Sequence, residues 1–139
     1  MYLLDTNVLS EVRKVRAGKA NRGVAAWADG VDGVDLFIST VTLEEIEIGV
    51  LLVERRDQRQ GEILRQWLVQ QVVPAFADRI LPVDIDVALR SAGLHVPDPR
   101  AIRDAYIAAT ALVHGLTLVT RNVADFDGCG VTLLDPWVD

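Results

Sequence analysis

MYLLDTNVLSE, the stretch at residues 1–11, decides the fold expected for this chain. It opens with the apolar run of residues 2–4, typical of a buried strand, and residues 8–12 then have the apolar spacing of a helix. The polar break between them, residues 5–7, reads Asp-Thr-Asn. A carboxylate at the end of a strand either caps the next helix or presents its charge beyond the sheet. The rest of the chain indicates what Asp5 does.

Short apolar runs alternate with helical patterns along the whole chain. We expect strands at residues 2–4, 36–38, 80–83, 117–119 and 131–134, helices at 41–54 and 60–73, and further helices that begin near Asn21, Asp84 and Arg100. The last helix has the clearest end, because Gly115 follows His114 where the pattern stops. Such alternation favours an α/β fold with a mostly parallel sheet and helices on both faces.

Composition bounds the class of protein. A chain of 139 residues that is 50% apolar is expected to form one domain, residues 1–139, around a single core. Its single cysteine, Cys129, indicates a reducing compartment, and no apolar run approaches the roughly 20 residues of a membrane helix. We therefore expect a soluble, cytoplasmic protein. The net charge of −6 means that nucleic acid would be met by a local basic rim or through a basic partner.

Three acidic side chains are expected to converge on one edge of the sheet. Open α/β sheets bind ligands beyond the carboxyl ends of their strands, where Asp5 lies. The segment TLVTRNVADF repeats the opening pattern and places Asn122 and Asp125 at that edge. Asp104 lies in the first turn of the helix that leads into this segment, and a right-handed crossover brings the start of such a helix to the same edge.

A fourth acid comes from the segment STVTLEEIEIGV. Glu44, Glu45 and Glu47 cannot all share one face of a helix. Gly49 lies one turn beyond Glu45 on the same side, where its missing side chain leaves space. On that basis we expect Glu45 to face the site.

Each acid also has a purely structural interpretation. Asp5 could cap a helix, in competition with Asn7, and Asp104 could simply favour a helix amino end. Asp125 could cap a final turn, and Glu45 could be a solvated helix residue. Their convergence favours another interpretation, because several carboxylates on one edge repel one another unless a cation lies among them.

An all-oxygen site of this kind selects Mg²⁺ or Mn²⁺. Zinc would need a closed set of His or Cys ligands, and His95, His114 and Cys129 show no such spacing. A divalent cation on carboxylates lowers the pKa of bound water and neutralises charge on a phosphoryl oxygen, which is the chemistry of phosphodiester hydrolysis. The side chains expected to position water or phosphate by hydrogen bonds are Thr6, Asn7 and Asn122.

Four ordered motifs resemble a known family. They are LLDTNVLSE, TLEEIEIG, DAYIAATA and LVTRNVADF, at residues 3–11, 42–49, 104–111 and 118–126. In this order and spacing they resemble the PIN-domain ribonucleases, and more narrowly the VapC toxins of type II toxin–antitoxin systems, in their FitB-like branch. The resemblance implies a single PIN domain over residues 1–139, an α/β/α sandwich with a small, mostly parallel sheet, and a metal-dependent endoribonuclease.

The resemblance also implies a catalytic set. Carried over by position, the acidic residues of the family fall on Asp5, Glu45 and Asp104. At the fourth position Asn122 stands where many PIN domains have Asp, while others rely on the acid three residues later, here Asp125. We assign Asp125 as the charged member and Asn122 as an outer ligand. The expected ligands of Mg²⁺ or Mn²⁺ are therefore Asp5, Asp104 and Asp125.

The family implies partners as well. These are an RNA substrate such as tRNA, a VapB-like antitoxin that blocks the site, a second toxin subunit in a homodimer, and operator DNA that the toxin–antitoxin hetero-oligomer binds through the antitoxin. Arg103 and Arg121 lie near the acids in sequence and are expected to contact RNA. Residues 50–53 are more apolar than one helix face requires, so they either bind a partner or are buried on both sides. The competing hypothesis is a non-catalytic PIN-like binding subunit of a repressor complex.

Overall fold

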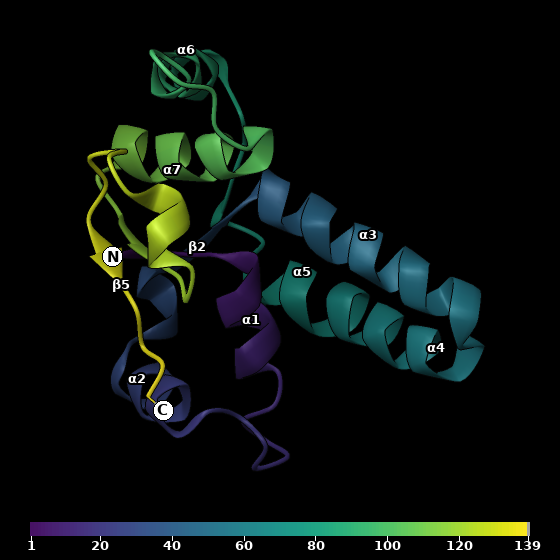
Figure 1. Ribbon diagram of the computed structural model, residues 1–139. Helices are drawn as coiled ribbons and strands as arrows, with labels where there is room; N and C mark the ends of the chain where they lie inside the picture. The colour runs from purple at the N-terminus through teal and green to yellow at the C-terminus, as the bar shows by residue number, and fades with distance from the viewer. Residues whose placement is uncertain (139) are drawn as a thin grey trace.

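The computed structural model describes residues 1–138 as an α/β fold in which short strands alternate with helices (Figure 1). The strands are β1 (Tyr2–Leu4), β2 (Leu36–Ser39), β3 (Ile80–Leu81), β4 (Thr117–Val119) and β5 (Leu133–Leu134). The helices are α1 (Thr6–Val12), α2 (Arg22–Gly30), α3 (Thr40–Arg56), α4 (Gln58–Trp67), α5 (Val73–Ala75), α6 (Ile85–Leu94) and α7 (Ile102–His114), with 3-10 turns η1 (Gly33–Asp35) and η3 (Val123–Phe126) and a π-helical turn η2 (Leu68–Val72). The end of the predicted domain, Asp139, lies outside the described residues.

The 5-stranded sheet has the order β3-β2-β1-β4-β5, and all neighbouring strands are parallel. The chain builds outward from β1 through β2 to β3, and then crosses to the other side of β1 to add β4 and β5. The strand order therefore reverses between β1 and β4, where Leu4 pairs with Val119. Such a switch point opens a crevice at the carboxyl ends of the strands. The next residues, Asp5 and Thr120, lie at that crevice.

Side-chain caps fix where most of the helices begin. A side-chain oxygen of the preceding residue accepts a backbone N–H of the helix, which satisfies a donor that would otherwise lack a partner. The capping residues are Asp5 for α1, Asn21 for α2, Ser39 for α3, Asp57 for α4 and Asp84 for α6. Helix α7 ends at Gly115, whose φ of 65° is the left-handed conformation that glycine adopts without strain.

Helices cover both faces of the sheet (Figure 1). Because side chains alternate along a strand, Leu3 and Leu118 pack with α7 residues such as Ala108 on one face. Leu4 and Val119 pack on the other face with residues of α1 and α3. The small alanines of α7 allow a close approach to the sheet, so the first turn of α7 is held near the switch point.

Helices α3 and α4 form a hairpin that projects from the sheet (Figure 1). Arg65 on α4 binds two carboxylates of α3, with its Nη2 atom 2.7 Å from Glu47 Oε2 and 3.0 Å from Glu54 Oε1. These two carboxylates raise the pKa of the Arg65 guanidinium. Gly61 lets the helices approach, because a Cβ added there would lie 2.6 Å from Glu54 Cα. The hairpin is thus held by a charge network and a glycine contact.

The predicted α/β fold with its parallel sheet is confirmed, and the differences lie at the ends of elements. The strands predicted at 80–83 and 131–134 are shortened to their paired residues, in β3 and β5. The helix predicted at 60–73 begins at Gln58 and widens into η2 before Pro74. Proline lacks an N–H and its ring clashes with the carbonyl four residues earlier, which accounts for the wider turn.

Residues 50–53 resolve an alternative that the sequence left open. Val50 is buried, but Leu51 and Leu52 are 52% and 58% exposed. The interpretation that this segment is buried on both sides is therefore wrong.

In the part of the chain that the structure describes, no helix is long and apolar enough to cross a membrane.

Candidate active site

Asp5 lies at the centre of the site, at the switch point between β1 and β4. Its side chain is only 6% exposed. Its Oδ1 atom accepts a hydrogen bond from the Thr6 N–H and its Oδ2 atom accepts one from the Thr120 hydroxyl, each at 2.8 Å. Burial raises the pKa of the Asp5 carboxyl, these two hydrogen bonds lower it, and the nearby charges of Glu45 and Asp125 raise it again. Asp5 thus caps α1 and also brings a partly desolvated carboxylate to the edge of the sheet.

Glu45 is tied to Asp5 through Thr6. The Thr6 hydroxyl donates a hydrogen bond to Glu45 Oε1 at 2.7 Å, while its N–H binds Asp5. The neighbouring glutamates have other partners. Glu44 is exposed and binds Arg103 at 3.2 Å, and Glu47 is held by the arginine of the hairpin. Of the three glutamates considered from the sequence, the structure therefore joins Glu45 to the residues around Asp5.

Asp104 and Asp125 complete the acidic cluster. Asp104 lies in the first turn of α7 and is partly buried. Burial, followed by the charges of Asp5, Asp125 and Glu45, raises the pKa of its carboxyl to about 6. Asp125 is exposed on η3, yet its charge raises the pKa values of both Asp5 and Asp104. Two strand ends and two helices therefore bring four carboxylates within electrostatic reach of one another.

Sequence reasoning missed the role of Thr120. This residue is fully buried, and besides its bond to Asp5 its hydroxyl accepts a hydrogen bond from the Asn122 N–H at 3.0 Å. The sequence shows only that Thr120 follows a strand, and the strand register shows the rest. Because Leu4 pairs with Val119, Thr120 follows β4 at the position where Asp5 follows β1.

The polar residues predicted to support the site are near it. Asn7 Nδ2 lies 3.4 Å from Asp5 Oδ2 and 3.5 Å from Thr120 Oγ1, and Asn7 Oδ1 accepts the Arg121 N–H at 3.4 Å. Asn122 reaches the site through its backbone N–H, and its side chain is exposed. Asn7 and Asn122 therefore connect the segments that follow β1 and β4.

The two predicted RNA-contacting arginines lie on the rim. Arg103 lines a hollow of about 920 Å³ between α3 and α7, together with Glu45 and Asp104. Arg121 is exposed, and its guanidinium carbon lies 5.5 Å from the centre of the Trp137 ring. Arg103 thus lines the same hollow as two of the acids, whereas the guanidinium of Arg121 lies against Trp137.

The donor set fits a hard cation that keeps part of its water shell. Within residues 1–138 no Lys, Arg or His forms an ion pair with Asp5, Asp104 or Asp125, so their mutual repulsion is uncompensated. In the same residues no three His, Cys, Asp or Glu side chains are already arranged to hold a metal ion. Mg²⁺ is bound in this way by few carboxylates, with waters and substrate phosphates as its other ligands. The acids and their neighbouring hydroxyls and amides therefore suit Mg²⁺ or Mn²⁺ better than zinc.

A match to one protein family covers the part of the chain that carries the acids. Residues 2–127 match the family model described as PIN domain. The chain belongs to the PIN-domain family. The match extends from β1 past Asp125, so it covers all four acids of the cluster.

Curated relatives of this PIN domain are similar along their whole length. Toxin FitB of Neisseria gonorrhoeae is 38% identical over 144 residues, with 100% of both chains covered. VapC ribonuclease Y4jK of Sinorhizobium fredii is 34% identical over 142 residues, covering 99% of this chain and 98% of the relative.

Solved structures of related chains have the same fold. A chain in the structure of FitAB bound to the IR36 DNA fragment has a TM-score of 0.88 and 35% identity, covering 100% of this PIN domain and 97% of that chain. A chain in a toxin–antitoxin complex from Klebsiella pneumoniae has a TM-score of 0.68 and 27% identity, with 100% of both chains covered.

Proposed function

We propose that this PIN domain is a Mg²⁺- or Mn²⁺-dependent endoribonuclease and acts as the toxin of a type II toxin–antitoxin system. The observation that carries the proposal is the acidic cluster, in which Asp5, Glu45 and Asp125 all raise the pKa of Asp104. A cluster of carboxylates that has no basic side chain paired with it contributes little to the stability of the fold, but it binds a divalent cation. The relatives named as a toxin and as a VapC ribonuclease support the same activity.

The chain's own residues divide the work of phosphodiester hydrolysis. Asp5, Asp104 and Asp125 would hold the cation, which supplies a water of lowered pKa and a positive charge for the phosphoryl oxygens. Glu45, oriented by the Thr6 hydroxyl, accepts the proton of the attacking water.

The remaining polar groups orient the substrate and the acids. Thr120 and Asn7 keep the Asp5 carboxylate in place, and the exposed amide of Asn122 is available as an outer ligand through water. Arg103 and Arg121, both exposed, bind phosphates of the RNA. A structured RNA such as tRNA is the proposed substrate.

The partners proposed for this chain follow from its relatives and its exposed apolar residues. A VapB-like antitoxin would cover the site, and Leu51 and Leu52 on α3 offer apolar surface to it or to a second toxin subunit. Operator DNA would be bound through the antitoxin, because this chain carries a net charge of −6. Relatives solved as a toxin–antitoxin complex and with bound DNA support both assignments. Light scattering on the isolated chain tests the homodimer.

Cleavage of total bacterial RNA by the purified chain, free of antitoxin, tests the proposal. We expect fragments with Mg²⁺ or Mn²⁺, none with EDTA, and none from Asp5→Asn, which keeps a residue able to cap α1 while it removes the carboxylate. Asp78→Asn, at an exposed position outside the site, is the matched control and should cleave normally. Intact RNA from a folded wild-type chain that binds neither metal would favour the non-catalytic binding subunit instead.

A further inference from the structure

A second hollow adjoins the acidic cluster. It has a volume of about 300 Å³, and its rim and wall include Thr6, Ser10, Arg13, Glu45, Gly49 and Trp67. Glu45 also lines the larger hollow between α3 and α7, so it is common to the two. Thr6 and Glu45, joined by a 2.7 Å hydrogen bond, connect the smaller hollow directly to Asp5. A substrate phosphate held at the acids would therefore have one neighbouring nucleotide beside this hollow.

Arg13 is held in position at the rim of the smaller hollow. Its guanidinium carbon lies 5.7 Å from the centre of the Trp67 ring, a cation–π contact that orients a planar guanidinium. The side chain is exposed, and within residues 1–138 it forms no ion pair. Among the residues that line this hollow, Glu45 is the one acidic side chain and Arg13 the one basic side chain. Its hydrogen-bond donors are therefore available to an anion.

The interior of the hollow has a different character from its rim. Apolar side chains of α3 and α4 line it, including Val50 and Leu64. Gly49 lies in its wall, and a Cβ added there would meet no atom within 4 Å. An apolar hollow beside an unpaired guanidinium suits a group that joins a flat, weakly polar ring to an anion, as a nucleotide does.

We infer that this hollow is a nucleotide subsite of the ribonuclease, in which the base of the nucleotide adjacent to the scissile phosphate enters beside Gly49 and its own phosphate is bound by Arg13. The inference rests on the proposed function. It adds Arg13 and the smaller hollow as the features that position the RNA. A nucleotide is favoured over an apolar peptide segment because the lining combines an apolar interior with the guanidinium of Arg13, which forms no ion pair within residues 1–138 and can bind a phosphate.

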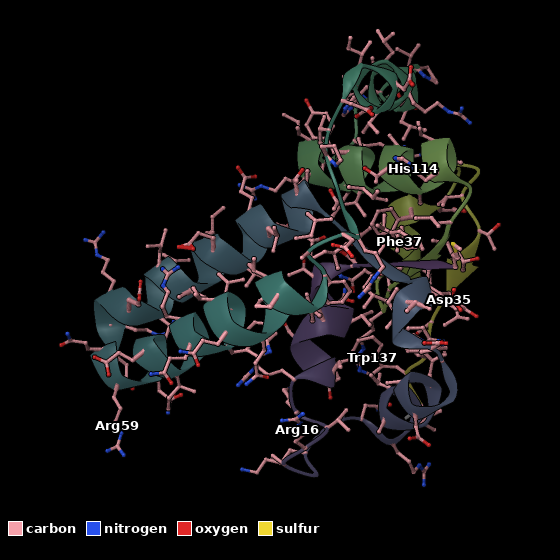
Figure 2. The ribbon with its side chains drawn as sticks, turned by 180° about the vertical axis from the view of Figure 1, so that it is seen from behind. Arg16, Asp35, Phe37, Arg59, His114 and Trp137 are labelled. Carbon is pink, nitrogen blue, oxygen red and sulfur yellow. The ribbon has the colours of Figure 1, made fainter. Side chains whose placement is uncertain are left out.

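Two pairs of variants test the subsite. Gly49→Leu fills the hollow, whereas Gly49→Ala adds one methyl group at a position with open space and favours the helix. Arg13→Ala removes the rim charge, whereas Arg59→Ala removes the same charge at the far end of the α3–α4 hairpin (Figure 2). Thermal unfolding of each variant establishes that it is folded.

The first readout is cleavage kinetics on total tRNA. We expect Gly49→Leu and Arg13→Ala to raise KM about tenfold with a smaller change in kcat, because the lost contacts bind substrate and transition state alike. Gly49→Ala, which adds only one methyl group, should raise KM less than Gly49→Leu does, and Arg59→Ala should keep the wild-type values.

The second readout is binding of the same tRNA in EDTA at several salt concentrations. Loss of one phosphate contact should reduce the slope of log affinity against log salt by about 1 in Arg13→Ala, with no change in Arg59→Ala. If the wild-type chain cleaves RNA but Gly49→Leu and Arg13→Ala match it in KM and slope, the subsite is wrong and the proposed function stands. The same result together with weaker binding of an antitoxin peptide would assign the hollow to the antitoxin. A wild-type chain that neither binds nor cleaves RNA would overturn both proposals.

Discussion

The Thr120 hydroxyl donates a 2.8 Å hydrogen bond to Asp5 Oδ2, and this bond joins the ends of two adjacent strands that are 115 residues apart in the chain. Both residues are buried. The bond lowers the pKa of a carboxyl that burial and neighbouring charges raise. Thr120 therefore helps to keep Asp5 ionised, and an ionised Asp5 is what a cation requires.

The first prediction concerns this bond. Thr120→Val keeps the shape of the side chain but leaves Asp5 Oδ2 without its hydroxyl donor, so the pKa of Asp5 should rise further. Because the active form needs the carboxylate ionised, the acidic limb of the pH–rate profile should move to higher pH. Activity at pH 6 should fall more than activity at pH 8. Cleavage rates measured from pH 5 to pH 9 at saturating Mg²⁺ test this.

Thr120→Ser is the matched control for that measurement. Serine keeps the hydroxyl that donates to Asp5 and accepts the Asn122 N–H, so the profile should stay close to that of the wild type. An unshifted acidic limb in Thr120→Val would mean that the bond does not control the ionisation of Asp5.

The second prediction separates two adjacent glutamates. Glu45→Gln removes the proposed base, which Thr6 orients, and general-base catalysis contributes roughly 10²- to 10⁴-fold to rate, so kcat should fall within that range. Glu44→Gln changes the same kind of group one residue away, where the carboxylate is exposed and pairs with Arg103. Its effect should be within about twofold, as for an exposed ion pair. Single-turnover cleavage rates of the two variants decide the matter, and equal losses would count against Glu45 as the base.

Sequence alone was sufficient to predict why Asp5, Asp104 and Asp125 approach one another. The prediction rests on local patterns and on the handedness of the crossover, and both follow from backbone geometry that every α/β sheet shares. Their places in the structure agree, at the end of β1, in the first turn of α7 and on η3.

What the sequence could not supply depends on contacts between segments far apart in the chain. Thr120 is expected after a strand at the same edge, but only the register of β1 and β4 places its hydroxyl beside Asp5. Likewise, what distinguishes Glu45 from Glu44 as the glutamate of the site is its hydrogen bond with Thr6, 39 residues away. The hollow between α1, α3 and α4 is likewise lined by residues far apart in the chain, among them Arg13 and Trp67, which are in contact.

The third prediction uses the repulsion within the acidic cluster. The pKa of Asp104 is raised from 3.8 to about 6, so between these pH values the folded chain binds a proton that the unfolded chain releases. The free energy of unfolding therefore falls as pH rises through this window, and the whole cost of the charged Asp104 is present above it. In EDTA at pH 7, Asp104→Asn should raise the free energy of unfolding by about 1 kcal/mol, once solvent screening of this partly buried group is allowed for.

Urea denaturation at pH 4 and pH 7, with and without Mg²⁺, tests the sign of this effect. The advantage of Asp104→Asn should shrink at pH 4, where the wild-type carboxyl is protonated in the folded chain. Mg²⁺ should stabilise the wild type more than the variant, because a ligand of the folded state stabilises in proportion to its binding. A variant less stable than the wild type in EDTA at pH 7 would mean that Asp104 is a structural residue of α7.

The fourth prediction compares two glycines of the same hairpin. Helix propensity alone predicts that replacing either of them by alanine stabilises the protein. Replacing a helical glycine by alanine normally stabilises by roughly 0.5–1 kcal/mol, and Gly49→Ala should do so because its Cβ meets no atom within 4 Å. At Gly61 the Cβ would lie 2.5 Å from Glu54 Cγ and 2.6 Å from Glu54 Cα, and the second of these atoms belongs to the backbone.

Gly61→Ala must therefore push α4 away from α3 and disturb the bonds of Arg65 to Glu47 and Glu54. We expect it to lower the free energy of unfolding by roughly 1–3 kcal/mol, which is the usual cost of overpacking. Urea denaturation of both variants measures the difference between them. Equal stabilisation by the two alanines would show that the hairpin can open at Gly61 without cost, and that the charge network alone holds α3 and α4 together.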